Sequence, residues 1–155
     1  NIKKPILDLI NREFQYTLEP PSEGSQEYPI HALGKTFKCD FAFRIRSGGW
    51  CFIEDDSAGT CLSNLLKYSA WIEETHPPMP VLLMHIVSPS DSAWIRLCRR
   101  EGVRLQTNLS GFKHILITTP DWPEQNPKWL EELRLKLKDA ATEINGTRVD
   151  ASQHG

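Results

Sequence analysis

Two stretches of alternating apolar and polar residues, 36–46 and 50–56, constrain the fold more than any other feature of the chain. A period of two is typical of β-strands that bury one face. The turn between the stretches is short and contains two glycines, which favours a hairpin. We therefore expect an antiparallel pair of strands, with Asp40 on the first strand and Glu54 and Asp56 on the second.

The alternation also assigns side chains to the faces of this hairpin. On the second strand, Glu54 and Asp56 share a face with Trp50 and Phe52. On the first strand, Asp40 falls on the polar face, opposite five apolar residues: Phe37, Cys39, Phe41, Phe43 and Ile45. Directly opposed positions have β-carbons about 5 Å apart, so a hairpin is expected to place Asp40 beside Glu54.

Two carboxylates at that separation predict a site for a divalent cation. Unpaired like charges repel, and a bound cation removes the repulsion. Mg²⁺ prefers oxygen ligands and usually takes one or two protein carboxylates. Asp40 and Glu54 therefore predict a Mg²⁺ or Mn²⁺ site, to which the peptide carbonyl of Asp55 adds a third oxygen. The alternative is that these acids solvate a turn or pair with Arg44 and Arg46.

The segment 60–75 follows the acidic residues and has the spacing of an amphipathic helix. A helix that begins there directs its N-terminal amides towards carboxylates and phosphate, and it carries Lys67 about two turns further in. The side predicted to face the core consists of Leu62, Leu65, Leu66, Ser69 and Ile72. The residues predicted to lie away from it are Asn64, Lys67, Tyr68 and Trp71.

The remaining patterns complete an α/β fold. They predict a first helix at 4–16, a polar loop at 20–29, an apolar strand at 80–87, a helix at 91–101, a strand at 111–119 and a last helix at 127–144. This order predicts a mixed sheet flanked by helices: helix, three-stranded meander, helix, strand, then helix, strand, helix. A single domain is expected over 1–145, with 146–155 as a flexible tail because few apolar residues anchor it.

The order of elements, together with Asp40, Glu54 and the helix segment from Asn64 to Tyr68, resembles the PD-(D/E)xK nuclease superfamily with its restriction-endonuclease-like core. The resemblance covers roughly residues 4–88. Asp40 matches the first acid of the family and Glu54 the second, at a spacing common in the family. Asp56 stands where the family usually has a strand lysine. Some branches move that lysine into the following helix, so Lys67 is the candidate migrated lysine.

The resemblance implies a divalent-metal-dependent endonuclease that hydrolyses phosphodiester bonds, in DNA rather than RNA. Asp40, Glu54, Asp56 and Lys67 are the implied catalytic residues, and Asp56 would either bind a second metal or hold Lys67 in place. Glu13 is a further implied ligand because some members supply an acid from the first helix; its alternative is a solvated carboxylate. The departure at Asp56 leaves a second hypothesis open, a catalytically inactive nuclease-fold module that binds nucleic acid or a protein partner.

The charge distribution allows contact with nucleic acid. A net charge of −2 argues against a strongly basic coat protein, yet binding depends on where the charges lie. The arginines predicted to contact phosphate are Arg44, Arg46, Arg96, Arg99 and Arg100. For the three arginines of the helix at 91–101, a solvated helix face is the alternative.

A third hypothesis is an interaction domain. In it, Trp71, Trp122 and Trp129 form the interface of a homodimer or of a larger assembly.

The cysteines and histidines give no zinc motif. Cys39, Cys51, Cys61 and Cys98 lack the close paired spacing of such motifs and are predicted to be buried, reduced thiols in an intracellular protein, cytoplasmic or nuclear. No stretch approaches the roughly 18 apolar residues of a membrane span. His85 lies within an apolar strand, so it is predicted to be a satisfied core residue rather than a ligand.

Overall fold

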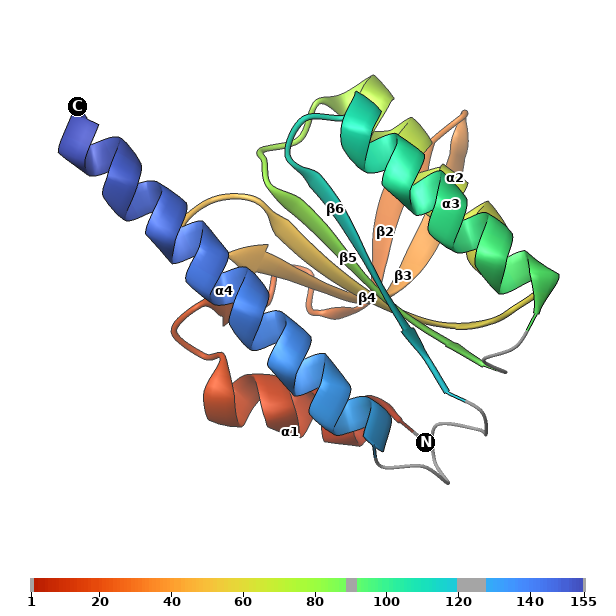
Figure 1. Cartoon of the computed structure of the whole chain (residues 1–155), viewed down its shortest axis with the longest axis horizontal. Coiled ribbons are helices and arrows are strands. Elements are labelled where there is room, and N and C mark those ends of the chain that lie inside the picture. Colours follow the sequence, from red (N-terminus) through yellow and green to blue (C-terminus); the bar gives the residue numbers. More distant parts are fainter. Residues whose placement is uncertain (1, 89–91, 120–127, 155) are drawn as a thin grey trace.

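The computed structural model describes residues 2–88, 92–119 and 128–154, and the side chains of its last helix as far as residue 144. Along the chain the elements are α1 (Lys3–Glu13), β1 (Leu18–Glu19), β2 (Gln26–Ala32), β3 (Lys35–Ile45), β4 (Trp50–Ser57), α2 (Cys61–Thr75), β5 (Val81–Ser88), α3 (Ala93–Asn108), β6 (Phe112–Thr118) and α4 (Lys128–His154). Figure 1 shows the sheet between two pairs of helices.

The sheet is mixed and contains six strands in the order β1-β3-β4-β5-β6, with β2 paired to β3. Strands β2, β3 and β4 form the antiparallel meander, while β4, β5 and β6 run parallel. Parallel neighbours need crossover connections, and α2 and α3 supply them. The predicted α/β class, a mixed sheet flanked by helices, is confirmed, as is the order of the elements.

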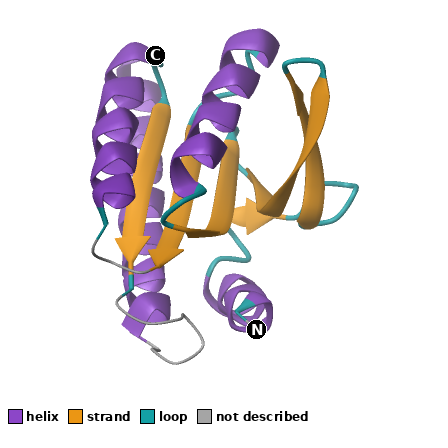
Figure 2. Ribbon diagram, turned by 90° about the vertical axis from the view of Figure 1, so that its right-hand side faces the viewer, coloured by secondary structure: helices purple, strands orange, loops and turns teal. Residues whose placement is uncertain are grey.

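Two hydrophobic cores lie on opposite faces of the sheet. Helices α1 and α4 pack on one face and α2 and α3 on the other, an arrangement that Figure 2 shows turned by 90°. All eight residues of β5 are buried because this strand has neighbours on both sides and helices on both faces. Its run of apolar residues is the sequence signature of that position.

The alternation in β3 shifts by one residue near Asp40, so the predicted single apolar face is wrong. Phe41 and Phe43 pack on the α1 and α4 side, whereas Cys39 and Ala42 both belong to the core under α2 and α3. Residues three apart share a face only where the alternation is interrupted. The pairing with β2 skips Asp40, and the pairing with β4 ends at the next residue, Phe41. Asp40 therefore lies at the interruption.

Helix α2 presents a different face to the core from the one predicted. Tyr68 and Trp71 are buried, while Leu66 is 44% exposed. The two aromatic rings pack on Phe52 of β4, with ring centroids 4.9 Å and 5.3 Å away. Large aromatic side chains bury more apolar surface than a leucine, and this contact sets the rotation of the helix.

Helix α3 is longer than predicted and continues through Gly102 to Asn108. Two of its large apolar side chains, Trp94 and Leu97, are 53% and 45% exposed. The predicted start at residue 91 lies outside the described residues. Ser92 caps the helix by accepting a hydrogen bond from the backbone N–H of Trp94 (3.1 Å).

Other boundaries also differ from the predictions. Helix α1 ends at Glu13, and β2 begins inside the predicted loop at 20–29. The backbone of α4 continues to His154, past the predicted end at Ile144, whereas the predicted flexibility of 146–155 stays a prediction. Trp122 lies outside the described residues. Over the described ranges, no helix combines the length and the apolar character that crossing a membrane requires.

Candidate functional site

Asp40 and Glu54 lie together at the point where β3 leaves the β4 ladder. The register between these strands ends at the pair Phe41 and Ile53. Beyond it, Asp40 Oδ2 accepts a hydrogen bond from the backbone N–H of Asp55 (2.8 Å), so a side chain replaces the next strand contact. The Asp40 carboxylate is also close enough to the Glu54 carboxyl group to raise its pKa. The two predicted metal ligands are therefore neighbours.

Glu54 is buried, with 5% of its surface exposed. Burial and the neighbouring Asp40 carboxylate raise the pKa of Glu54 to about 9, although a hydrogen bond from the Tyr68 hydroxyl opposes the rise. The group therefore carries a proton near neutral pH unless a cation compensates its charge. Burial also holds the pKa of Tyr68 well above its usual value, which keeps its hydroxyl proton available for donation.

Asp56, two residues further along β4, has two strong partners of its own. His85 Nε2 lies 2.5 Å from Asp56 Oδ2, and Asn64 Nδ2 donates to Asp56 Oδ1 (2.6 Å). Burial alone would raise the pKa of Asp56, but hydrogen bonds from His85, Asn64 and Thr60 and the electrostatic interaction with His85 lower it overall. Asp56 is thus an ionised carboxylate that protein groups already bind.

Lys67 is connected to Asp56 through the side chain of Asn64. Its Nζ donates to Asn64 Oδ1 (3.0 Å) and lies 4.8 Å from the centroid of the Phe37 ring. Asn64 and Tyr68 are one helical turn apart, so α2 places one side chain on Asp56 and the other on Glu54. The helix register aligns these groups with the end of β4.

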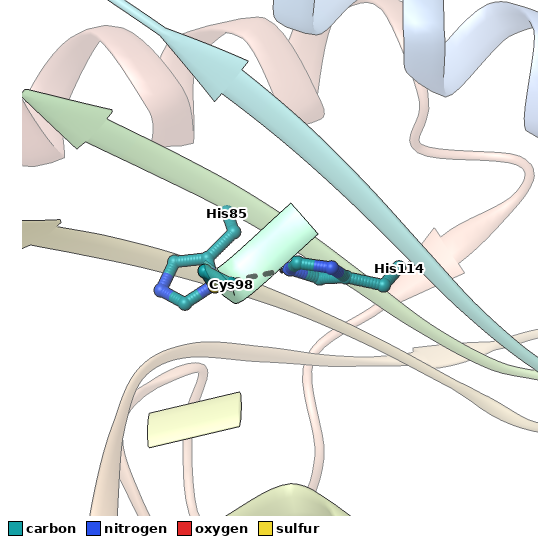
Figure 3. Close-up of side chains that lie close together, drawn as sticks. All are labelled: His85, Cys98 and His114. Carbon is teal, nitrogen blue, oxygen red and sulfur yellow. Dashed lines mark hydrogen bonds between the residues drawn. The ribbon is translucent and has the colours of Figure 1, made fainter. Parts of the chain in front are cut away.

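His85 is fully buried and hydrogen-bonded, as predicted for a core histidine. Besides Asp56 it contacts His114 of β6, with His85 Nδ1 and His114 Nε2 3.2 Å apart. Cys98 of α3 joins them, and one potential ligand atom from each residue lies within 4.8 Å of the others. Figure 3 shows the three side chains converging. This group was not predicted, because its members are far apart in the sequence and share no motif.

The ionisation of this group follows from its burial. Burial, His85 and Arg99 together lower the pKa of His114 to about 3, so its ring is neutral. Burial, together with the adjacent Cys61, raises the pKa of Cys98. All four cysteines are buried free thiols, as predicted.

Two of the predicted nucleic-acid contacts, Arg44 and Arg46, lie away from the acidic pair. Arg44 stacks over the Trp50 ring (5.0 Å) at the other end of β4, about 13 Å from Glu54 along the strand. Arg46 binds Glu19 and the carbonyl of Gln15 (both 2.9 Å). The three arginines of α3, Arg96, Arg99 and Arg100, are exposed, with Arg99 close enough to act on His114.

The other two predicted metal ligands, Glu13 and Asp55, have different environments from the acidic pair. Glu13 ends α1 on the opposite face of the sheet, where it pairs with Arg134 (3.5 Å) and Arg12 (3.6 Å). Asp55 is exposed, and its backbone pairs with Ile86 of β5. The structure thus brings Asp40 and Glu54 together and separates Glu13 from them.

A cavity of about 590 Å³ opens at the far end of the parallel strands. Pro80 and Phe112, at the starts of β5 and β6, line it, whereas Asp56 pairs with Val87 near the end of β5. The described residues that line this cavity include none of the predicted site residues.

Comparison of the chain with models of protein families, with characterised proteins and with solved structures finds no match.

Proposed function

We propose that the chain is a divalent-metal-dependent endonuclease that hydrolyses phosphodiester bonds, in DNA in preference to RNA. The observation that carries this proposal is the closeness of Asp40, which binds the Asp55 N–H, to the buried Glu54 carboxyl group, at positions that match the acids of the PD-(D/E)xK resemblance. A buried carboxyl group beside a second carboxylate needs either a proton or a cation. Of the two, a bound cation is the one that would give the pair a role in catalysis.

The donor set fits Mg²⁺ or Mn²⁺. Both are hard cations that take carboxylate oxygens, and Asp40 and Glu54 would hold the ion after Glu54 releases its proton. When bound, the metal supplies positive charge that offsets the charge developing on the phosphoryl oxygens.

Lys67 is proposed to orient the attacking water or to balance charge on the phosphoryl group. Its position depends on Asn64, which in turn depends on Asp56. Because both carboxylate oxygens of Asp56 have protein partners, we assign Asp56 to the positioning of Lys67 rather than to a second metal.

The second candidate is a nuclease-fold module without activity that binds nucleic acid or a protein partner. The observation that favours it is that the acids already have protein partners: Asp40 binds the Asp55 N–H, and Glu54 binds Tyr68. The enzyme and the nucleic-acid-binding form of the second candidate share the proposed partner, DNA contacted through Arg96, Arg99 and Arg100. A homodimer and a cytoplasmic or nuclear location are further parts of the proposal.

The test combines metal binding with cleavage. Mn²⁺ and Mg²⁺ binding is measured by titration calorimetry, and cleavage with plasmid DNA and an RNA of similar length, for wild type, Asp40→Asn and Glu54→Gln. We expect both variants to lose metal binding and to cleave on the order of 100-fold more slowly. Asp8→Asn, which changes an exposed carboxylate on α1, is the control and should behave as wild type.

Lys67→Ala separates the two candidates further. The enzyme hypothesis predicts metal binding without cleavage in this variant, and full retained activity would remove Lys67 from the mechanism. A wild-type protein that retards DNA but neither cleaves it nor binds metal would assign the second function. A protein that binds neither metal nor nucleic acid would contradict the nuclease hypothesis. Only the protein-binding form of the second candidate would then remain.

A further inference from the structure

Three side chains with the donor atoms of a transition-metal site converge between the sheet and α3. His85 comes from β5, His114 from the adjacent strand β6, and Cys98 from the helix that connects them. His85 and Cys98 have no exposed surface, and His114 is partly buried. The connection between the parallel strands returns the chain over the sheet, so three distant parts of the sequence meet at one point.

The spacing of the donor atoms suits one metal ion. In a tetrahedral site with metal–ligand bonds of 2.0–2.3 Å, ligand atoms lie about 3.4 Å apart. His85 Nδ1 and His114 Nε2 are 3.2 Å apart, and one potential donor atom from each of the three residues lies within 4.8 Å of the other two. The three residues are therefore close enough to share one ion.

Asp56 prepares His85 to act as a ligand. A carboxylate only accepts hydrogen bonds, so the contact between Asp56 Oδ2 and His85 Nε2 (2.5 Å) places the ring proton on Nε2. The lone pair of Nδ1 then points towards His114. A carboxylate on the outer nitrogen of a histidine is the arrangement that orients ligating histidines in metalloproteins.

We propose that His85 Nδ1, His114 Nε2 and Cys98 Sγ bind one Zn²⁺ ion, at a site separate from the Asp40 and Glu54 pair. Two imidazoles and one thiolate suit Zn²⁺ and do not suit Mg²⁺, which prefers oxygen ligands. The Cys98 thiol loses its proton on binding. The Cys61 thiol, which lies near Cys98 and donates to the carbonyl of Ala58 (3.2 Å), is not one of the three ligands.

The zinc site explains why an acid occupies position 56. Asp56 accepts from His85 on one oxygen and from Asn64 on the other, and Asn64 binds Lys67. A lysine at position 56 could not accept the His85 proton. Zn²⁺ at His85 therefore fixes Asp56 and, through Asn64, the side chain of Lys67. The zinc proposal stands on its own geometry and does not depend on nuclease activity.

The test uses Co²⁺ as a spectroscopic probe and Zn²⁺ as the native ion, with the full chain kept under a phosphine reductant that does not bind metal. We expect one Zn²⁺ per chain, retained in excess Mg²⁺, and a thiolate-to-Co²⁺ charge-transfer band. Cys98→Ala should lose this band, and His114→Gln should weaken Co²⁺ binding at least tenfold. The matched controls are Cys51→Ala, another buried thiol, and His31→Gln, an exposed histidine; both should keep the band.

If a variant of a buried residue does not fold, two further measurements still test the proposal. Zn²⁺ should raise the unfolding temperature of the wild type, and the variant Asp40→Asn/Glu54→Gln should keep the charge-transfer band. A wild type without this band, or a band that survives in folded Cys98→Ala, would overturn the site. A band lost in the Asp40→Asn/Glu54→Gln variant while its fold remains would also overturn it, because the metal would then belong to the carboxylate pair.

Discussion

At the scale of single residues, Glu54 has the least favourable environment for a charge. Its carboxyl group is buried beside a second carboxylate, and Tyr68 supplies a hydrogen bond. A proton or a cation therefore has to complete the site. The two possibilities predict different effects of pH on stability, since a cation replaces the proton.

The stability of the metal-free protein should fall as the pH rises because of Glu54. The pKa of Glu54 is about 9 in the folded protein and 4.5 ordinarily. Between these values the folded state binds more protons than the unfolded state, so the free energy of unfolding falls as pH increases. Glu54→Gln should remove much of this slope in unfolding temperatures measured from pH 5 to pH 9.

Asp8→Asn is the control for this experiment and should keep the wild-type slope, because Asp8 is exposed. Saturating Mn²⁺ should flatten the wild-type slope in the same way as Glu54→Gln. A Glu54→Gln protein with the full wild-type slope would show that another group carries the pH dependence.

At the scale of elements, α3 approaches β6 closely at Gly102. A β-carbon built there would lie 2.2 Å from His114 Nδ1. The glycine is therefore required by packing and not by backbone conformation. It allows the helix to lie directly over the histidine that the zinc proposal uses.

Gly102→Ala should destabilise the protein, against the usual trend. Alanine in a helix is normally more stable than glycine by about 0.5–1 kcal/mol, but the contact with His114 should reverse the sign and cost about 1–3 kcal/mol. Urea unfolding measures the change. Gly59→Ala, where nothing lies within 4 Å of the new β-carbon, is the control. A stabilised Gly102→Ala protein would contradict this packing.

At the scale of the whole molecule, one sheet joins two cores. Leu65 of α2 belongs to one core and Leu133 of α4 to the other, and both are fully buried. Strand β5 contributes alternate residues to each core. Loss of packing on one face of the sheet therefore destabilises the strands that also form the core on the other face.

We predict a single unfolding transition, affected equally from either face. Leu65→Ala and Leu133→Ala should each lower the free energy of unfolding by about 2–5 kcal/mol. Leu66→Ala and Leu135→Ala, which change leucines 44% and 48% exposed on the same helices, should each cost less than about 1 kcal/mol. Tryptophan fluorescence and far-ultraviolet circular dichroism should give coincident curves. Two separated transitions would contradict a single domain over 1–145.

The spacing of apolar residues over short stretches of the sequence determined most of the helices and strands. The hairpin, the apolar β5 and the helix after β4 follow from patterns within ten to fifteen residues, and these include the neighbouring positions of Asp40 and Glu54. Local patterns suffice there because strand pairing in a hairpin places opposed residues at a set distance.

Tertiary contacts decided the rest. The shift in β3 near Asp40, the burial of Tyr68 in place of Leu66, and the meeting of His85, Cys98 and His114 all depend on which distant element packs where. A helix with apolar residues on several sides takes the rotation that buries the largest rings. Parallel strands joined by a crossover bring together residues that no sequence spacing connects. The sequence alone therefore located the carboxylate pair, whereas the histidine and cysteine group exists only in the folded chain.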